Sequence, residues 1–141
     1  MTIFKKKIVK WGLLSILLIL ATAGVVGYKM YTKPHRNVEE AKAVNAQAEK
    51  LVAAYESDEA LANGQYLDKV LEVSGEVTEI SKNQKNESVI VLKGTDMGTV
   101  RCTLSGEVSP GTRTGVQAVI KGICTGYLTD VIMVRCILEQ K

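Results

Sequence analysis

An unbroken run of 18 uncharged residues near the N-terminus constrains this chain more than any other feature. From Trp11 to Tyr28 the sequence reads WGLLSILLILATAGVVGY. At about 1.5 Å per residue such a run makes roughly 27 Å of helix, close to the ~30 Å hydrocarbon core of a bilayer. Lysines bracket the run, and aromatic rings near both ends suit the two membrane interfaces. We therefore expect a transmembrane helix over residues 11–31, preceded by a basic tail over residues 1–10.

A cleavable signal peptide is the alternative reading of the same segment. Its pattern is present, with basic residues 5–7, apolar residues 13–20 and the small-residue sequence Ala21-Thr22-Ala23. Apolar residues nevertheless continue past that point to Tyr28, which an anchor requires and a cleaved signal does not. A mature chain starting at Gly24 would contradict the anchor.

Charge separates the N-terminal part from the remainder of the chain. Residues 1–36 hold seven of the 18 Lys and Arg residues and none of the 15 Asp and Glu residues, which leaves 11 bases, 15 acids and a net charge of −4 beyond them. Because non-specific nucleic-acid affinity comes mainly from Lys and Arg, this acidic remainder is poorly suited to it. A short tail and a folded C-terminal part favour a single-pass protein of the bacterial inner membrane, with its C-terminal domain in the periplasm.

A stalk rich in Ala, Glu and Lys follows over residues 32–66. Asn37 and Glu40 fit a capping box, so we expect a helix to begin there. An apolar stripe then recurs at three- and four-residue steps, through Val38, Ala41, Val44, Ala48, Leu51, Val52 and Tyr55. Ser57-Asp58 should interrupt this helix, and a short second helix should end at Asn63-Gly64. The stripe either packs on the following domain or forms a coiled-coil spacer between two copies.

Residues 67–141 change to a hydrophobic period of two, which predicts a β domain. Clusters of Gly, Asn and Pro separate five expected strands, at residues 69–80, 88–93, 99–104, 116–123 and 131–138. A long first strand with a central Gly75, and the widest gap between the third and fourth strands, fit an OB-fold. The expected fold class is therefore mainly β with an N-terminal helical part: a five-stranded OB-fold-like Greek-key barrel preceded by a helix and a transmembrane helix. An SH3-like barrel is the main alternative.

Four stretches of sequence carry a family resemblance. They are AEKLVAAYESDEALANGQY, LDKVLEVSGEVTEI, VRCTL and IKGICTGYLTDVIMVRCIL, and the most specific part is the GICTGY turn with Asp130 and Cys136. Over roughly residues 45–138 the chain resembles the tRNA_anti-like family of bacterial OB-fold proteins. The resemblance implies a barrel similar to the anticodon-binding domain of tRNA synthetases, in an envelope protein. Many members are lipoproteins, but Cys102 is the first cysteine here, so we expect no lipid attachment near the N-terminus. Gly and Pro in residues 105–115 leave little room for the helix that the family pattern places there.

Two groups of residues are candidate contact surfaces. The first lies around the last hairpin, where OB-folds often meet ligands, and comprises Tyr66, Thr125, Tyr127 and Asp130. The second is the surface that a nucleic acid would use, and comprises Lys93, Arg101, Lys121 and Arg135. Single strands are usually gripped by aromatic platforms beside basic grooves, whereas the β domain has neither Trp nor Phe. Both groups also fit structural roles. The tyrosines of the first group could pack against the barrel, and the Lys and Arg residues of the second could be solvated side chains on the outer face of the strands.

The three cysteines fall on inward-facing positions of their expected strands. The pattern places Cys136 on one face with Val134 and Leu138. Because no Cys-x-x-Cys pair and no histidine lies near any cysteine, we expect neither a metal nor a cofactor. The third and fifth strands are neighbours in an OB barrel, so Cys102 and Cys136 are the pair that we expect to form a disulfide in an oxidising compartment.

Catalysis has little support in the sequence. The only histidine, His35, lies in the stalk, where we expect it to contact lipid headgroups, and no nucleophile in the β domain has a histidine base. The sequence therefore predicts a non-catalytic, membrane-anchored binding or scaffolding module of the cell envelope, with the lipid bilayer and an envelope protein or small ligand as partners. The alternative is an OB-fold nucleic-acid-binding protein anchored on the cytoplasmic side. Oligomeric state is left open.

Overall fold

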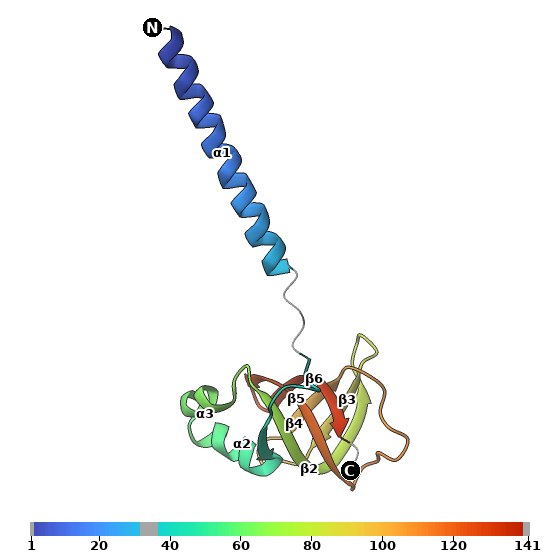
Figure 1. The fold of residues 1–141 in the computed structure, drawn as a ribbon. Coiled ribbons are helices and arrows are strands. Elements are labelled where there is room, and N and C mark those ends of the chain that lie inside the picture. The colour runs from blue at the N-terminus through green and yellow to red at the C-terminus, as the bar shows by residue number, and fades with distance from the viewer. Residues whose placement is uncertain (1, 32–36, 140–141) are drawn as a thin grey trace. The chain divides into compact units, whose positions relative to one another are not determined.

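The computed structural model describes residues 2–31 and 37–139, with side chains from residue 9 onward. The chain divides into two compact units, Met1–Arg36 and Asn37–Lys141. The first unit is helical, and the second contains a β-barrel with two short helices (Figure 1). The expected headgroup contact of His35 falls outside the described residues.

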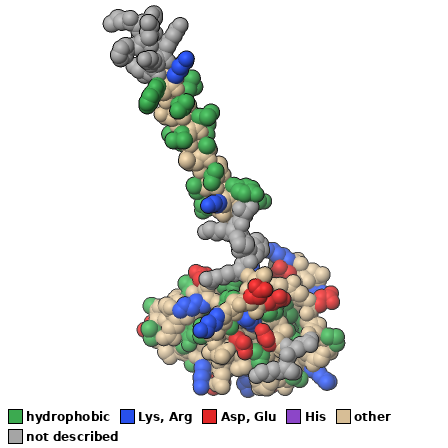
Figure 2. Space-filling model, in the orientation of Figure 1, with side chains coloured by type: hydrophobic (Ala, Val, Ile, Leu, Met, Phe, Trp, Pro, Cys, Tyr) green, Lys and Arg blue, Asp and Glu red, His purple; other side chains and the backbone are tan. Residues whose placement is uncertain are grey.

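Helix α1, Thr2–Tyr31, contains the uncharged run. Its segment Val9–Tyr31 has a mean hydropathy of 2.1 and is not buried within the structure. Figure 2 shows hydrophobic side chains along the described part of this helix. The helix is long and apolar enough to cross a membrane, although a signal sequence near an N-terminus has the same properties. The predicted apolar helix is confirmed.

Five strands close into a barrel in the second unit. They are β2 (Val70–Lys82), β3 (Ser88–Leu92), β4 (Val100–Leu104), β5 (Gln117–Tyr127) and β6 (Val131–Glu139). The order around the barrel is β2–β3–β4–β6–β5, and β2 pairs with β5 to close it. The β4–β6 pair is parallel, and the other neighbours are antiparallel. This is the topology of an OB-fold, and the predicted five-stranded barrel is confirmed.

Strand β6 contains a bulge at Arg135, whose φ is +52°. The register of β6 shifts there against both neighbours, so Met133 and Cys136 both face the core while Val134 is half-buried. The prediction that Val134 shares the inward face of Cys136 is wrong, because one extra residue in a strand reverses the alternation of its faces. Gly122 of β5 lies against this bulge, and a Cβ there would overlap the Sγ of Cys136. The glycine therefore allows β5 and β6 to pack closely.

The predicted helix begins at Ala48 and not at Asn37. Residues 38–40 form a turn, and a sixth strand, β1 (Val44–Gln47), follows. β1 pairs in parallel with residues 71–74 in the first half of β2. The three- and four-residue spacing of apolar side chains permitted a helix here, but pairing with the edge of a distant strand outweighs this local preference.

Residues 37–43, directly before β1, are fastened to the barrel. We call residues 37–43 the strap. Within it Val38 is 6% exposed, and the backbone carbonyl of Glu39 accepts a 2.9 Å hydrogen bond from the Nζ of Lys121 on β5. The strap therefore lies on the outer surface of β5.

Helices α2 (Ala48–Ser57) and α3 (Glu59–Tyr66) cover one end of the barrel (Figure 1). The predicted break between them is confirmed, since Asp58 begins α3 by accepting a 3.0 Å hydrogen bond from the amide of Leu61. α3 continues two residues beyond the predicted stop at Gly64.

The apolar stripe of α2 packs on its own domain. Its residues Leu51, Val52 and Tyr55 are at most 2% exposed. Gly75 of β2 makes this packing possible, since a Cβ there would come within 2.9 Å of the Cβ of Ala48.

The loops of the barrel differ from the prediction at one place. The β4–β5 loop, residues 105–116, has no helix, as expected. Strand β5, by contrast, continues to Tyr127, beyond the predicted end at Ile123, and Tyr127 pairs with Val131. The last turn is thereby shortened to residues 128–130. Thr125 and Tyr127 consequently belong to a strand and not to a hairpin loop.

Candidate ligand-binding surfaces

Three tyrosines meet where the two helices cover the barrel. The ring of Tyr55 stacks on that of Tyr127, with centroids 5.5 Å apart, and its centroid lies 6.2 Å from that of Tyr66. The hydroxyl of Tyr55 is 3.4 Å from the Sγ of Cys124. Burial, and then this hydrogen bond, raises the pKa of Tyr55 above its ordinary value. Tyr66 and Tyr127, which we expected on a contact surface, are half-buried members of this cluster.

Asp130 joins two neighbouring loops. Its Oδ1 accepts hydrogen bonds from the amide of Thr99, at 2.9 Å, and from the hydroxyl of the same residue, at 2.7 Å. Its Oδ2 lies 3.8 Å from the Nη2 of Arg101. Thr125 is exposed, and its hydroxyl donates to the carbonyl of Ile132 at 3.2 Å. In the first candidate surface, the polar groups of Thr125 and Asp130 thus have partners within the domain, and the rings of Tyr66 and Tyr127 pack beside Tyr55.

The four basic residues of the second candidate surface do not form one groove. Lys121 is 8% exposed and donates to the strap, and Arg101 faces the carboxylate of Asp130. Lys93 and Arg135 are exposed, the first after β3 and the second at the β6 bulge. On the face shown in Figure 2, Lys and Arg side chains are dispersed, while several Asp and Glu side chains lie together. A single-stranded nucleic acid is bound by Lys and Arg side chains that lie next to one another along its phosphate backbone. The four residues of this candidate surface do not supply such a row.

Strands β3 and β4 form the face on which OB-folds usually hold a ligand. The outward residues of β3 are Val89 and Val91, each 5% exposed, and they pair with Thr103 and Arg101 of β4. Aromatic rings at such positions contribute about 1–3 kcal/mol for each base that stacks on them. Small aliphatic side chains cannot stack in this way, so this face lacks the usual platform for nucleic-acid bases.

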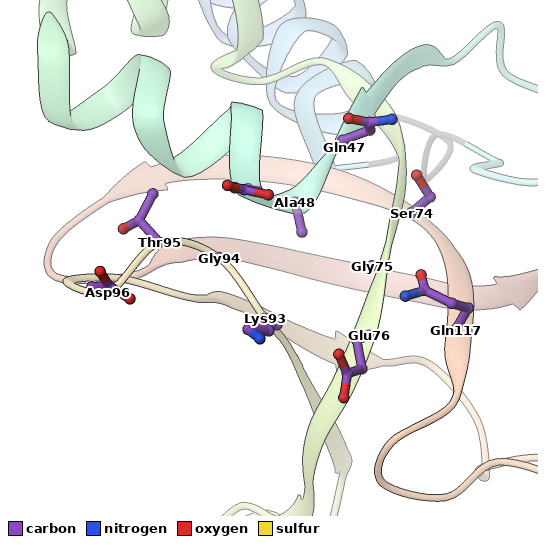
Figure 3. A pocket seen from close by; sticks show the side chains of 11 residues that line it. Gln47, Ala48, Ser74, Gly75, Glu76, Lys93, Gly94, Thr95, Asp96 and Gln117 are labelled. Carbon is purple, nitrogen blue, oxygen red and sulfur yellow. The ribbon is translucent and has the colours of Figure 1, made fainter.

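An open hollow of about 640 Å³ lies where β1 ends and α2 begins. Its lining comes from four segments far apart in sequence, residues 47–49, residues 74–76, residues 93–96 and Gln117. Figure 3 shows Lys93 and Asp96 on one side of Gly75 and Gln117 on the other. The lining is polar and holds three carboxylates against one ammonium.

A second hollow, of about 460 Å³, lies along β1. It shares Gln47 and Ser74 with the first. Its other lining residues are Asn45, Ala46, Lys50, Leu51, Tyr66, Glu72 and Val119. We call the two hollows together the β1 groove. Of the residues predicted as sites, Tyr66 and Lys93 line it.

Sequence reasoning missed most of the β1 groove. Its wall depends on β1, which was predicted as helix, so Gln47 and Asn45 were not recognised as surface residues of a sheet. The sequence signal available was the pair of glycines, Gly94 and Gly98. In the structure a Cβ on Gly94 would overlap the carbonyl of Gly98, so this loop, which contributes Asp96 to the groove, is tight.

The predicted cysteine pair lies together in the core. Cys102 and Cys136 are free thiols at 0% exposure, and hydrogen bonding between them, followed by burial, raises the pKa of Cys136. In the register, however, Cys136 stands opposite Leu104, two residues along β4 from Cys102. That offset of ~6.6 Å, with a strand spacing of ~4.8 Å, separates the two α-carbons by roughly 8 Å, beyond the ~6.8 Å limit for disulfides. The bond would require backbone movement and stays a prediction.

Metal-ligating side chains do not gather in the described part of the chain. Within residues 2–31 and 37–139 there is no group of three or more His, Cys, Asp and Glu residues that could hold an ion. The polar and charged side chains that line the groove can offer hydrogen bonds and charge to a ligand.

Fold and surfaces together define a small OB-fold protein with a polar groove and without an aromatic platform. The tRNA_anti-like family model matches residues 1–138, so the chain belongs to the tRNA_anti-like family and the predicted resemblance is confirmed. Among solved structures, the chain is similar to one from Klebsiella pneumoniae subsp. pneumoniae MGH 78578 described as a "putative nucleic acid-binding lipoprotein". The two are 15% identical with a TM-score of 0.50, over 67% of this chain and 92% of the other. At this identity the likeness concerns the fold. Comparison with curated proteins gave no match.

Proposed function

We propose that this protein is a non-catalytic binding module of the bacterial cell envelope, held at the inner membrane by α1 with its barrel in the periplasm. The apolar segment Val9–Tyr31 supports the anchor. The single observation that carries the binding role is the β1 groove, a polar recess beside a barrel whose usual ligand face carries Val89 and Val91.

The absence of catalysis belongs to the same proposal. The barrel sequence contains no histidine to serve as a general base. The thiols of Cys102 and Cys136 are buried, and the raised pKa of Cys136 disfavours the thiolate that a nucleophile needs. The groove residues are suited to recognition by hydrogen bonds and charge.

Membrane topology tests the location. A reporter enzyme that is active only in the periplasm should be active when it is fused after Lys141. In parallel, extraction of membranes at high pH should leave the full-length chain in the lipid fraction. A reporter active only in the cytoplasm, or a mature chain that starts at Gly24, would overturn the proposed location.

Nucleic-acid binding is the second candidate, favoured by the description of the similar Klebsiella structure. It predicts submicromolar binding of single-stranded oligonucleotides at low salt, with affinity falling steeply as salt rises. The barrel domain is acidic, and its Lys and Arg side chains are dispersed. Both properties favour no oligonucleotide binding above background. Filter binding with DNA and RNA oligonucleotides separates the two functions.

A further inference from the structure

The strand β1 leaves one of its edges open. Within residues 37–139 its backbone pairs with β2 alone, from Val44 opposite Leu71 to Gln47 opposite Ser74. Every strand of the closed barrel has neighbours on both sides, so β1 is the edge of the sheet. Backbone N–H and C=O groups on such an edge are hydrogen-bonded by water or by an added strand.

A hollow adjoins β1. The second hollow is lined by Asn45 and Ala46 of β1 together with Lys50 and Tyr66 of the two helices, and it continues onto β2 at Glu72. Asn45 and Gln47 are exposed, and Val44 is 42% exposed. The ring of Tyr66 and the aliphatic stem of Lys50 offer apolar contacts to alternate side chains of a neighbouring strand.

Charge along the groove favours a basic occupant. Its lining holds four carboxylates, from Glu49, Glu72, Glu76 and Asp96, against the ammonium groups of Lys50 and Lys93. Within residues 37–139 none of the four carboxylates takes part in an ion pair. Basic side chains of a ligand would therefore find unpaired acidic partners.

We propose that the open edge of β1 binds an extended, basic peptide segment of a partner protein by strand addition. Main-chain hydrogen bonds to β1 supply affinity, and lysine or arginine side chains that reach the groove carboxylates supply selectivity. The inference rests on the proposed function, for which it names the class of partner.

The test uses the full-length chain in detergent micelles and a defined probe, an eight-residue capped peptide of alternating lysine and valine. Hydrogen exchange of the backbone amides, read by mass spectrometry or NMR, should slow at least about tenfold at residues 44–47 when the peptide binds. A peptide of alternating glutamate and valine should bind at least about tenfold more weakly at low salt. The same basic peptide with N-methylated amides on its pairing edge should give no protection.

Two variants separate charge from strand pairing. Glu72→Gln with Glu76→Gln on β2 should weaken binding of the basic peptide several-fold. The control Glu87→Gln with Glu107→Gln removes the same charge from loops outside the groove and should leave binding unchanged. Absence of protection at residues 44–47, or equal binding by the N-methylated peptide, overturns strand addition. A cytoplasmic reporter would overturn the proposed location and leave this result standing, so the two failures are distinguishable.

Discussion

At the scale of single residues, the barrel depends on glycines at positions where a Cβ atom would overlap a neighbouring strand. Gly122 on β5 lies against the β6 bulge, where Arg135 adopts a positive φ and turns Cys136 back into the core. The bulge explains why alternation alone failed to place Val134. No simple sequence pattern marks a bulge, because it inserts one residue without changing the composition of the strand.

Replacing Gly122 with alanine should lower the free energy of unfolding by about 1–3 kcal/mol, since the added Cβ overlaps the Sγ of Cys136 and the closed barrel leaves no room to shift. Denaturant unfolding of the domain measures this. Gly111→Ala is the matched control, because no heavy atom lies within 4 Å of the Cβ that it adds. Equal stability of the two variants would show that β5 and β6 are not packed as described.

Alkaline pH should destabilise the barrel. The fold raises the pKa of Cys136 above 9.0 and that of Tyr55 above 10.0. Both groups are neutral when folded, so their stabilisation is complete below the unfolded values and declines as pH rises past about 9. Each group should remove about 1.4 kcal/mol per pH unit once its unfolded form ionises. Urea unfolding between pH 7 and pH 11 checks this, and a Tyr55→Phe variant should show a shallower decline above pH 10.

At the scale of elements, the strands of the barrel were predictable and β1 was not. Five strands with a period of two, separated by Gly and Asn turns, were each predicted to within a few residues of their observed ends. β1 spans only Val44–Gln47, lies inside an apolar stripe that fits a helix, and exists because β2 has an open edge. A local pattern holds no information about that edge. The β1 groove, which combines residues from five segments of the chain, was hidden for the same reason.

The strap depends on one buried amine. Lys121→Met keeps the length of the side chain and removes the 2.9 Å hydrogen bond to Glu39, which should release residues 37–43 at a cost of about 1–2 kcal/mol. Because a loss of 1 kcal/mol raises an open population about fivefold, trypsin should cut after Lys42 several-fold faster. Cleavage after Lys85, in a distant turn, should not change. Unaltered cleavage at Lys42 would mean that the hydrogen bond does not hold the strap.

At the scale of the whole molecule, the chain consists of two units that differ in the burial of their apolar side chains. The hydrophobic core is one cluster of buried residues, all between Ala48 and Cys136. The apolar side chains of Val9–Tyr31 are exposed. The distribution of charge in the sequence predicted this division, because residues 1–36 contain Lys and Arg but no Asp or Glu. Partner identity was beyond the sequence, because a partner is recognised by surfaces that only the fold assembles.

A fragment of residues 37–141 should therefore fold and stay monodisperse without detergent, with a thermal midpoint within a few degrees of the full chain in micelles, because it keeps the whole core. Circular dichroism and sedimentation measure both properties. The full chain should aggregate when detergent is removed. Aggregation of the fragment, or an aqueous full chain that retains residues 1–31, would contradict the two-unit description.

The strap also decides how the protein would respond to mechanical load. Tension that reaches the barrel from the N-terminal side must pass through residues 37–43, so the bond from Lys121 to Glu39 meets it first and the short β1 ladder next. The first contact is one hydrogen bond and the β1 ladder has four residue pairs, whereas the β2–β5 ladder of the barrel has seven. Under tension, these two contacts should therefore break first. Their rupture would lengthen the connection by several residues before any strand of the barrel separates.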